Sequence, residues 1–555
     1  MPRLTGRYAM LDQLLAEGVK YVFGNPGTTE QAFMDALQEY PQIEYILSLH
    51  EGAATGVADA YARASGRPAF LQLHIMPGLG NAMGMLYNSY RTGTPLVVYA
   101  GQHPQRGASQ EPILAGDLVR LAEPVTKWAA QAEDAAEIPV LMRRAFKSVQ
   151  ESPRGPVFIS VPANVMDEEA EMDIFPSNHP DTRSRPSPEA IEKVARILAE
   201  AKSPVIVAGD GVSISGGQAE LVKLAEATGS RVLTTFAAEL PFPSAHPLYG
   251  GLIAVVSGAM LRGQFATADV IVAIGTPVLT LLFPLDESPF PPNAKIVHID
   301  NDVRELGKNW KLDLGVLADP RLAMIDVLEA LGRVQTGDQR TEAKKRAEQV
   351  AAAGDAIGAA LDASARGKWD NMPMNAGRMM SEIAGAMDPA TVLYDESITS
   401  GGFLGRYLKF DETGRHYRAT GGGLGPGMPA PIGIKLARPD RPVMSIVGDG
   451  AALYTIQALW TQAREGLDAV TVIYNNRSYA ILNLELNRVG AEPPGPRARA
   501  MLDLSGPDLD FVAIARGFGV AASRATSADD FAKQLERALA APGPALIEAM
   551  VPSIV

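Results

Sequence analysis

The most informative stretch of this chain is Val443-Met-Ser-Ile-Val-Gly-Asp-Gly450. Its apolar first part, Val443–Val447, predicts a buried parallel strand, and a helical pattern follows it through Trp460. A second apolar run, Val470–Tyr474, ends in Asn475-Asn476, with 24 residues between Gly450 and Asn475. Open α/β sheets bind ligands at the carboxyl ends of their strands, so the two polar endings are predicted to face one ligand.

The residues at these strand ends suit a diphosphate and a divalent cation. Glycines such as Gly448 and Gly450 let the backbone approach phosphate oxygens, and the N-terminus of the following helix favours their negative charge. The side-chain oxygens of Asp449 and Asn476, with the Ser478 carbonyl as a third donor, are hard ligands of the kind that Mg²⁺ prefers. The alternative is two unrelated turns that happen to end neighbouring strands.

Three blocks of similar size alternate short β-branched runs with helical patterns, which is typical of parallel sheets covered by helices. The predicted fold is therefore α/β, with three domains that each hold a mostly parallel sheet flanked by helices, at residues 1–166, 187–335 and 370–555. The polar, Pro-rich stretch Asp167–Pro188 is predicted to be a linker, and the charged, Ala-rich segment Asp338–Ala363 a helix.

The predicted strands outside the two runs described above lie at Tyr21–Phe23, Tyr45–Leu47, Ala69–Leu73, Leu96–Tyr99, Val157–Val161, Val205–Ala208, Val232–Thr235, Val270–Ile274, Lys295–Ile299, Thr391–Tyr394 and Ala545–Ala549. The middle block has its own Gly-Asp-Gly at Gly209–Gly211, but no Asn-Asn pair follows at a matching distance. We interpret that second copy as a turn.

Composition restricts the class of protein. A content of 46% hydrophobic and 20% charged residues is ordinary for a globular protein, and the net charge of −13 argues against binding to nucleic acid or to acidic membranes. No apolar run is long enough to span a bilayer, and the N-terminus lacks a secretory signal pattern. There are no cysteines, which excludes disulfides and thiolate chemistry. We expect a cytoplasmic enzyme.

The spacing of the Gly-Asp-Gly and Asn-Asn motifs resembles the cofactor signature of the pyruvate decarboxylase and acetolactate synthase superfamily, whose members use thiamine diphosphate (ThDP) and Mg²⁺ to break or make a carbon–carbon bond next to a carbonyl. Leu49-His-Glu-Gly-Ala-Ala54 is similar to the glutamate motif of that superfamily. The resemblance implies that Glu51 acts on pyrimidine N1′ of the cofactor; the alternative is that Glu51 only stabilises a helix N-terminus.

The resemblance also implies an oligomer. Glu51 and Asp449 fall in the first and third predicted domains, which would be the pyrimidine-binding and diphosphate-binding domains of the superfamily. Members of the superfamily place the cofactor between such domains of two subunits. We therefore expect a homodimer or homotetramer with active sites between subunits.

Within the superfamily, the whole chain is similar to the benzoylformate decarboxylase family. The matching segments are Val22–Thr28 (VFGNPGT), Leu73-His74, Gly78–Gly84 (GLGNAMG), Gly155–Val157 (GPV) and Gly422–Gly425 (GGLG). By this resemblance the Gly422 carbonyl would accept the cofactor's amino group, and Leu424 would support its bent conformation. The implied cofactor-binding residues are Glu51, Asn81, Thr399, Gly422, Leu424, Gly448, Asp449, Gly450, Tyr454, Asn476 and Tyr479.

Two residues of the first domain are implied to be catalytic beside Glu51. His74 matches a histidine that faces the cofactor and transfers protons, a task that suits imidazole at neutral pH; the alternative is a buried histidine satisfied by backbone. Thr28 takes the place of a serine that binds the substrate carboxylate; the alternative is a simple turn residue. Both residues would also line the substrate pocket.

The chain departs from the family at the second catalytic histidine. The corresponding segment, Gly275–Pro284, has no histidine, and Leu282 is the nearest positional match. Ile481 and Leu482 take the remaining substrate-pocket positions, while Glu485 replaces an aromatic residue. A decarboxylase that releases an aldehyde must deliver a proton to its intermediate, so this loss favours carboligation or acyloin cleavage.

The predicted function is a 2-oxo acid decarboxylase with carboligase ability, acting on a small 2-oxo acid or aldehyde. An acetolactate-synthase-like or benzaldehyde-lyase-like carboligase is the alternative, and a noncatalytic ThDP-fold scaffold is a more distant one. Acetolactate synthases often bind FAD in the middle domain, but no nucleotide fingerprint supports FAD here. A nucleotide-dependent enzyme is disfavoured, since the chain lacks a P-loop and no G-x-G-x-x-G opens a helix after its first strand.

Overall fold

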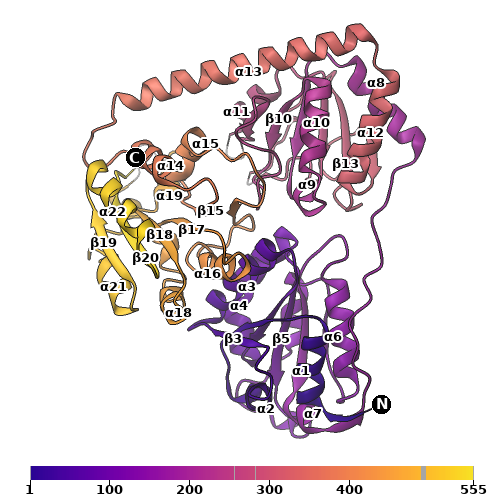
Figure 1. Ribbon diagram of the computed structural model, residues 1–555, viewed down its shortest axis with the longest axis vertical. Helices are drawn as coiled ribbons and strands as arrows, with labels where there is room; N and C mark the ends of the chain where they lie inside the picture. The colour runs from indigo at the N-terminus through magenta and orange to yellow at the C-terminus, as the bar shows by residue number, and fades with distance from the viewer. Residues whose placement is uncertain (1, 255–256, 282, 489–494, 554–555) are drawn as a thin grey trace. The chain divides into compact units, whose positions relative to one another are not determined.

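The computed structural model describes residues 2–254, 257–281, 283–488 and 495–553 (Figure 1). The chain divides into two compact units. The first unit comprises Met1–Pro180, Asp370–Phe403 and Ala419–Val555, and the second comprises Asp181–Trp369 and Leu404–Arg418. Within the described residues, the strands form three large sheets and one small ribbon. The three sheets confirm the predicted α/β class with helices flanking mostly parallel strands.

The N-terminal sheet of the first unit has the strand order β3-β2-β4-β5-β7-β6, and all its pairs are parallel. Its strands are β2 (Tyr21–Gly24), β3 (Glu44–Leu47), β4 (Ala69–Leu73), β5 (Leu96–Gln102), β6 (Ala129–Gln131) and β7 (Val157–Pro162). Gly24 pairs with both Leu47 and Gln72, so β2, β3 and β4 end at one edge of the sheet. The segments that follow these strands therefore start side by side.

Alternate residues of this sheet face two separate cores, as the period of two in a strand requires. One face packs on helices α1 (Gly6–Ala16), α2 (Gln31–Leu37) and α6 (Glu137–Ser148). The other face packs on α3 (Glu51–Ser65), α4 (Ile75–Thr92) and α5 (Leu118–Ala122). Helices α3 and α4 begin directly after β3 and β4, at the edge where these strands end.

The predicted linker is wrong in its first part. The short strand β8 (Glu169–Glu171) lies inside Asp167–Pro188 and pairs antiparallel with β1 (Arg3–Thr5). A polar strand of three residues has no apolar alternation, so only its long-range partner reveals it. The helix α7 (Ala163–Asp167) precedes it, and α8 (Pro188–Glu200) begins at the end of the predicted linker.

The sheet of the second unit has the order β11-β10-β9-β12-β13-β14 with parallel pairs. Helices α8, α10 (Gln218–Thr228) and α12 (Pro320–Val334) share one core with it (Figure 1), and α11 (Gly258–Phe265) packs on its other face. Its strands are β9 (Pro204–Ala208), β10 (Arg231–Thr234), β11 (Tyr249–Leu252), β12 (Val270–Ile274), β13 (Lys295–Asp300) and β14 (Leu314–Leu317). The 30-residue helix α13 (Gly337–Arg366) follows.

The second Gly-Asp-Gly is not a simple turn. Asp210 is the first residue of the short helix α9 (Asp210–Ile214). Its Oδ1 accepts the backbone N–H groups of Ala238 at 2.8 Å and Glu239 at 3.1 Å. Asp210 therefore anchors a neighbouring loop of the second unit.

The C-terminal sheet of the first unit holds β15 (Val392–Glu396), β17 (Val443–Gly448), β18 (Ala469–Asn475), β20 (Ala545–Met550) and β19 (Ala521–Ala525), in this order and parallel. Gly448 pairs with Tyr474, so Asp449 and Asn475 leave the sheet at the same edge. Helices of this part are α14 (Ala376–Ala386), α16 (Ala430–Ala437), α18 (Ala458–Arg464), α19 (Ala480–Arg488), α20 (Pro496–Ala500), α21 (Phe511–Gly517) and α22 (Ala528–Ala540).

The helical pattern predicted from Gly450 through Trp460 is interrupted. A single turn, α17 (Asp449–Ala452), is followed by a non-helical segment before α18 begins at Ala458. Within that segment the Thr455 hydroxyl donates to the Gly425 carbonyl, which takes the chain out of the helical path. Local periodicity cannot reveal such a contact across 30 residues.

Helices α3 and α16 pack tightly within the first unit and share a core with both of its sheets. A Cβ at Gly433 would overlap the Val57 carbonyl oxygen, and one at Gly56 would lie 2.5 Å from Pro429 Cγ. Glycine at these two positions allows the close approach. In the described ranges, no helix is both long and apolar enough to span a membrane.

Candidate active site

Glu51 is the first residue of α3, directly beyond the end of β3. The His50 side chain accepts the Gly52 N–H at 3.0 Å and caps the helix, which places Glu51 in its first turn. The Glu51 side chain is buried, and Asn81 Nδ2 donates to its Oε2 at 3.0 Å. A Cβ at Gly78 would lie 2.9 Å from Oε1. The structure thus brings Glu51 and Asn81, two predicted site residues, into direct contact between α3 and α4.

His74 lies between the end of β4 and the start of α4, and a carboxylate that sequence reasoning missed holds its ring. His74 Nδ1 is 2.9 Å from Glu30 Oε2, and Glu30 has no exposed surface. A carboxylate at this distance accepts the Nδ1 proton, so Nε2 is left to accept or donate one. The ring is therefore not satisfied by backbone, as the alternative interpretation required.

Four hydrogen-bond donors surround the Glu30 carboxylate. Besides the His74 ring, it accepts the Thr29 hydroxyl at 2.6 Å and the backbone N–H groups of Gly27 and Gly101 at 3.0 and 2.9 Å. This set satisfies a buried charge that would otherwise be costly. A Cβ at Gly27 would overlap the His74 ring, so glycine is needed there.

Thr28 begins the short 3-10 helix Thr28–Glu30 and is exposed. The neighbouring hydroxyl, that of Thr29, is buried and lies 3.4 Å from His74 Nδ1. In this structure it is Thr29 rather than Thr28 that contacts the histidine. The predicted carboxylate-binding role of Thr28 stays a prediction.

On the C-terminal sheet, Asp449 and Asn476 follow the ends of β17 and β18. Asp449 is buried, and its carboxylate accepts the N–H groups of Gly450 at 2.8 Å and Arg477 at 2.7 Å. Burial raises the pKa of Asp449 to about 6, while backbone N–H groups act in the opposite direction. Asn476 Oδ1 accepts the Ser478 N–H at 2.9 Å. These oxygens keep further lone pairs for a cation.

The residues around Asp449 and Asn476 pack closely. A Cβ at Gly450 would lie 2.5 Å from the Tyr479 ring, so the two predicted cofactor residues are in contact. Behind the turn, Asn475 Nδ2 donates to the buried Glu548 at 2.7 Å, and Asn475 Oδ1 accepts the Arg477 N–H at 3.1 Å. Glu548 was not foreseen, because it arrives from β20 at the far end of the sequence.

The loop Gly421–Gly427 and the segment after β15 complete the C-terminal part of the site. Gly422 is exposed with a φ of 90°, and Leu424 is half-buried. Thr399 is half-buried and follows Ile398, whose φ of 48° is strained for a β-branched residue. Tyr454 is exposed.

Glu396, at the end of β15, is a further carboxyl that sequence reasoning missed. It is buried, and its two oxygens accept the N–H groups of Gly425 and Gly427, each at 2.7 Å. Burial raises the pKa of Glu396 to about 8. An acid two residues beyond an apolar strand run was the available signal for this residue, as it was for Asp449.

The predicted substrate pocket is described only in part. Ile481 is half-buried and Leu482 is exposed, both on α19, while Leu282 lies outside the described residues. Their assignment stays a prediction.

Over the part of the chain that the structure describes, no group of three His, Cys, Asp or Glu side chains is placed to hold a metal ion. The predicted Mg²⁺ ligands are the Asp449 carboxylate, the Asn476 amide and the Ser478 carbonyl. Only one of these is an acidic side chain, so this predicted site is not a group of that kind. Mg²⁺ is commonly held by one or two carboxylates completed by phosphate oxygens and water. The donors at Asp449 and Asn476, with the Gly450 backbone in contact with Tyr479, therefore fit a Mg²⁺–diphosphate group.

Three α/β sheets, a buried glutamate at one strand end and a Gly-Asp-Gly with Asn-Asn at two others define the class of thiamine-diphosphate-dependent enzymes. Profiles of the thiamine pyrophosphate enzyme N-terminal binding domain, central domain and C-terminal binding domain match residues 4–121, 191–331 and 399–549. The chain belongs to this family of thiamine pyrophosphate enzymes.

Relatives of two activities resemble the chain over its whole length. It is 34% identical to a provisionally named acetolactate synthase large subunit, IlvX, of Mycobacterium tuberculosis, with 100% of both chains covered. It is 30% identical to a benzoylformate decarboxylase of Pseudomonas aeruginosa, with 97% of each covered. The solved 4-hydroxybenzoylformate decarboxylase of Rhodococcus jostii RHA1 has a TM-score of 0.85 at 27% identity, covering 99% of this chain and 100% of that one.

Proposed function

We propose that this chain is a ThDP- and Mg²⁺-dependent 2-oxo acid decarboxylase with carboligase ability. The observation that carries the proposal is the His74–Glu30 pair. Aldehyde release needs a group that delivers a proton, and the family's second histidine is missing here. With Nδ1 paired to Glu30, the His74 ring has Nε2 free for that proton transfer.

The residues of the two sheets divide the remaining tasks. When bound, the cofactor supplies a nucleophilic carbon and an electron sink for the loss of CO₂. Glu51 would hold a proton at pyrimidine N1′, with Asn81 fixing the orientation of its carboxylate. Asp449, Asn476 and the Ser478 carbonyl would hold Mg²⁺ and the diphosphate. Gly422 and Leu424 would contact the aminopyrimidine.

The substrate would be a 2-oxo acid with an apolar or aromatic side chain. Thr28 would bind its carboxylate through the exposed hydroxyl, and the apolar residues Ile481, Leu482 and Leu282 would line the side-chain pocket. The likeness to two decarboxylases of benzoylformate-type acids supports an aryl side chain.

A second candidate is carboligation of the acetolactate synthase type. The 34% identity to IlvX over the full length favours it, as does the segment Gly275–Pro284 without histidine. In that case a second carbonyl compound would take the place of the proton. FAD is not part of this proposal, because the middle domain has no nucleotide fingerprint.

We further propose that the chain acts as a homodimer or homotetramer, with Glu51 of one subunit serving the cofactor held by Asp449 of another. Sedimentation of the loaded protein would give the number of subunits. Mixing Glu51→Gln with Asp449→Ala subunits would restore activity only if sites form between subunits. The cytoplasmic location and the boundaries 1–166, 187–335 and 370–555 stay predictions.

The test of the proposed function is CO₂ release from a panel of 2-oxo acids, with ThDP and Mg²⁺ present or withheld. The panel would include benzoylformate, phenylpyruvate, pyruvate and 2-oxobutyrate, and aldehyde and acyloin products would be identified. We expect cofactor-dependent formation of benzaldehyde from benzoylformate. Glu51→Gln should bind ThDP but lose at least about a hundredfold in kcat, as the loss of an acid–base group does.

Other product patterns would contradict the decarboxylase proposal. Acyloin as the sole product from 2-oxo acids would establish the carboligase candidate instead. If no acid releases CO₂ while acyloins are cleaved to aldehydes, the protein is a lyase. Equal inactivity of the parent and Glu51→Gln, with ThDP bound to both, would favour a noncatalytic scaffold.

A further inference from the structure

The backbone of the loop Gly421–Gly427 is held at alternate residues by side chains from two different parts of the first unit. Asn88 of α4 forms a reciprocal pair with Gly423: Nδ2 donates to the Gly423 carbonyl, and Oδ1 accepts the Gly423 N–H, both at 2.9 Å. Because an amide has one donor end and one acceptor end, this pair also determines the orientation of the Asn88 side chain.

The C-terminal sheet holds the rest of the loop. Glu396 accepts the N–H groups of Gly425 and Gly427 with separate oxygens, each at 2.7 Å. The Thr455 hydroxyl donates to the Gly425 carbonyl. Three buried side chains thus engage the backbone of Gly423, Gly425 and Gly427.

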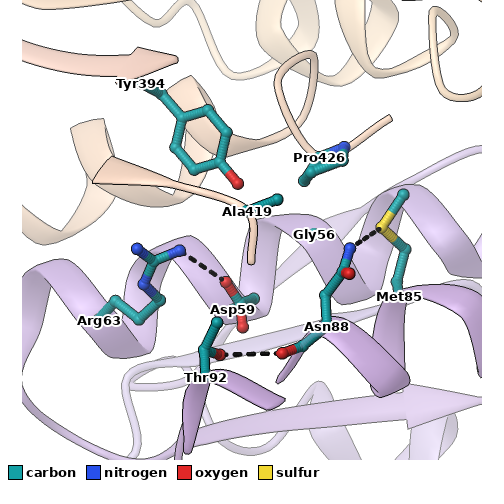
Figure 2. Close-up of a pocket in the computed structure, with 9 residues that line it drawn as sticks. All are labelled: Gly56, Asp59, Arg63, Met85, Asn88, Thr92, Tyr394, Ala419 and Pro426. Carbon is teal, nitrogen blue, oxygen red and sulfur yellow. Dashed lines mark hydrogen bonds and ion pairs between the residues drawn. The ribbon is translucent and has the colours of Figure 1, made fainter. Parts of the chain in front are cut away.

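Steric contacts also restrict the loop. A Cβ at Gly421 would overlap Asn88, one at Gly423 would lie 2.7 Å from the Gly84 carbonyl oxygen, and one at Gly425 would lie 2.7 Å from Tyr454 Cβ. Figure 2 shows Asn88 beside Met85 on α4, across from Pro426 at the end of the loop. The loop therefore packs closely on α4, with the Asn88 and Met85 side chains against it.

The two residues between the held positions, Gly422 and Leu424, make none of these contacts. Gly422 is exposed, and nothing lies within 4 Å of the place where its Cβ would be. Leu424 is half-buried. Leu424 packs against the core that the two sheets share. The loop thus has a fixed backbone at alternate residues and leaves Gly422 open to a ligand, an arrangement that suits recognition of a planar amino-substituted ring.

We propose that Asn88 and Glu396 are positioning residues that hold this loop preformed for the aminopyrimidine of the cofactor. The inference rests on the proposed function for the identity of the ligand, but the holding contacts do not depend on it. Because α4 begins beside His74 and carries Asn81, Asn88 makes the shape of the cofactor loop depend on the helix that also builds the proton-transfer site.

The test uses the full-length chain and measures hydrogen exchange of peptides that cover residues 421–427, with and without ThDP and Mg²⁺. The variants are Asn88→Ala and Glu396→Gln, because Gln keeps one acceptor and turns a donor toward the other N–H. Matched controls are Asn178→Ala and Glu536→Gln, which change exposed residues of the same unit. Circular dichroism and thermal midpoints would verify folding.

We expect faster exchange in the loop peptides of both variants without cofactor, and no change in the controls. Apparent ThDP affinity should fall by about tenfold or more, since each variant loses one or two hydrogen bonds. With saturating ThDP, the KM for the 2-oxo acid should stay near the parent value while kcat falls. A merely structural role would lower the thermal midpoint without this local signature.

Parent-like exchange in residues 421–427 together with parent-like ThDP affinity in both variants would overturn the inference. If Glu396→Gln fails to fold, Thr455→Val removes one donor without changing the side-chain shape and takes its place. The two proposals fail separately. A parent that binds no ThDP refutes the proposed function, whereas a parent that turns over while both variants match it refutes only the positioning role.

Discussion

Three buried glutamates of the first unit, Glu30, Glu51 and Glu396, differ in the groups that donate hydrogen bonds to their carboxylates. Glu30 has four donors, one of them the His74 ring, and so holds that ring in place. Glu51 has the Asn81 amide as its donor, which leaves much of its carboxylate for a ligand. Glu396 accepts two backbone N–H groups and so holds the loop Gly421–Gly427 in place.

The first prediction concerns the Glu30–His74 pair. Glu30→Gln should lower kcat by about tenfold to a hundredfold, because the amide no longer defines which ring nitrogen carries the proton, and partners of this kind change activity by such factors. The pH profile of kcat should change shape. ThDP affinity should stay at the parent value, since Glu30 contacts His74 rather than the diphosphate residues.

The measurement is steady-state kinetics across pH with saturating ThDP, beside Glu44→Gln, an exposed glutamate of the same sheet, as the control. A pH profile of Glu30→Gln that overlays the parent would show that the pair has no part in proton transfer.

Among the elements, the contact between α3 and α16 is the tightest constraint, because it joins the helix that begins with Glu51 to the helix that follows the cofactor loop. At Gly56 and Gly433 an added Cβ would overlap the neighbouring helix or its N-cap Pro429. Packed interiors have few voids, so an added methyl group at such a point must displace backbone. The two glycines thereby fix how closely α3 and α16 pack within one chain.

The second prediction concerns the contact between α3 and α16. Gly433→Ala should destabilise the chain by about 1–3 kcal/mol or more, since the new Cβ would overlap the Val57 carbonyl oxygen. The control is Gly358→Ala in α13, where nothing lies near the new methyl group and alanine should stabilise the helix by up to about 1 kcal/mol. Thermal or denaturant unfolding measures both.

Opposite signs for the two substitutions are the expected result. Equal small effects would mean that α3 and α16 separate easily, and the close approach would then not constrain the packing of the two helices.

For the molecule as a whole, Glu396 couples stability to pH. Its folded-state pKa of about 8 lies above the ordinary value of 4.5, with burial as the main cause and Asp395 adding to it. Between these two values the folded chain holds a proton that the unfolded chain has released, so stability falls as pH rises through this window. Below it both states are protonated, and above it both are ionised.

The third prediction is a comparison of thermal stability between the parent and Glu396→Gln from about pH 5 to pH 9 without cofactor. The parent should lose stability relative to the variant as pH rises, by at most about 5 kcal/mol, because one pKa unit corresponds to about 1.4 kcal/mol. A difference that stays constant across this range would show that Glu396 does not titrate there.

The α/β class, most strands and the principal motif residues follow from the sequence by itself. Parallel strands buried on both faces leave long apolar runs, and the residues directly after them lie at the ligand-binding edge whatever the rest of the chain does. The placement of Asp449 and Asn476 at strand ends was predicted in this way, whereas Glu51 and His74 were assigned through the family resemblance, and the roles of all four stay predictions. The strands β4 and β12 match their predicted bounds. Several others end one to three residues later than predicted, because the last ladder pairs extend into residues such as Glu396 and Gln102.

Only the tertiary structure revealed the partners of these residues. Glu30 lies 44 residues from His74, Asn88 lies 335 residues from Gly423, and Glu548 lies 73 residues from Asn475. The β1–β8 ribbon and the break before α18 depend on contacts of the same kind. The local sequence pattern indicates which residues are buried and with what period. A hydrogen bond between distant segments does not change that pattern. The partner of each buried carboxylate is therefore determined only by the tertiary structure.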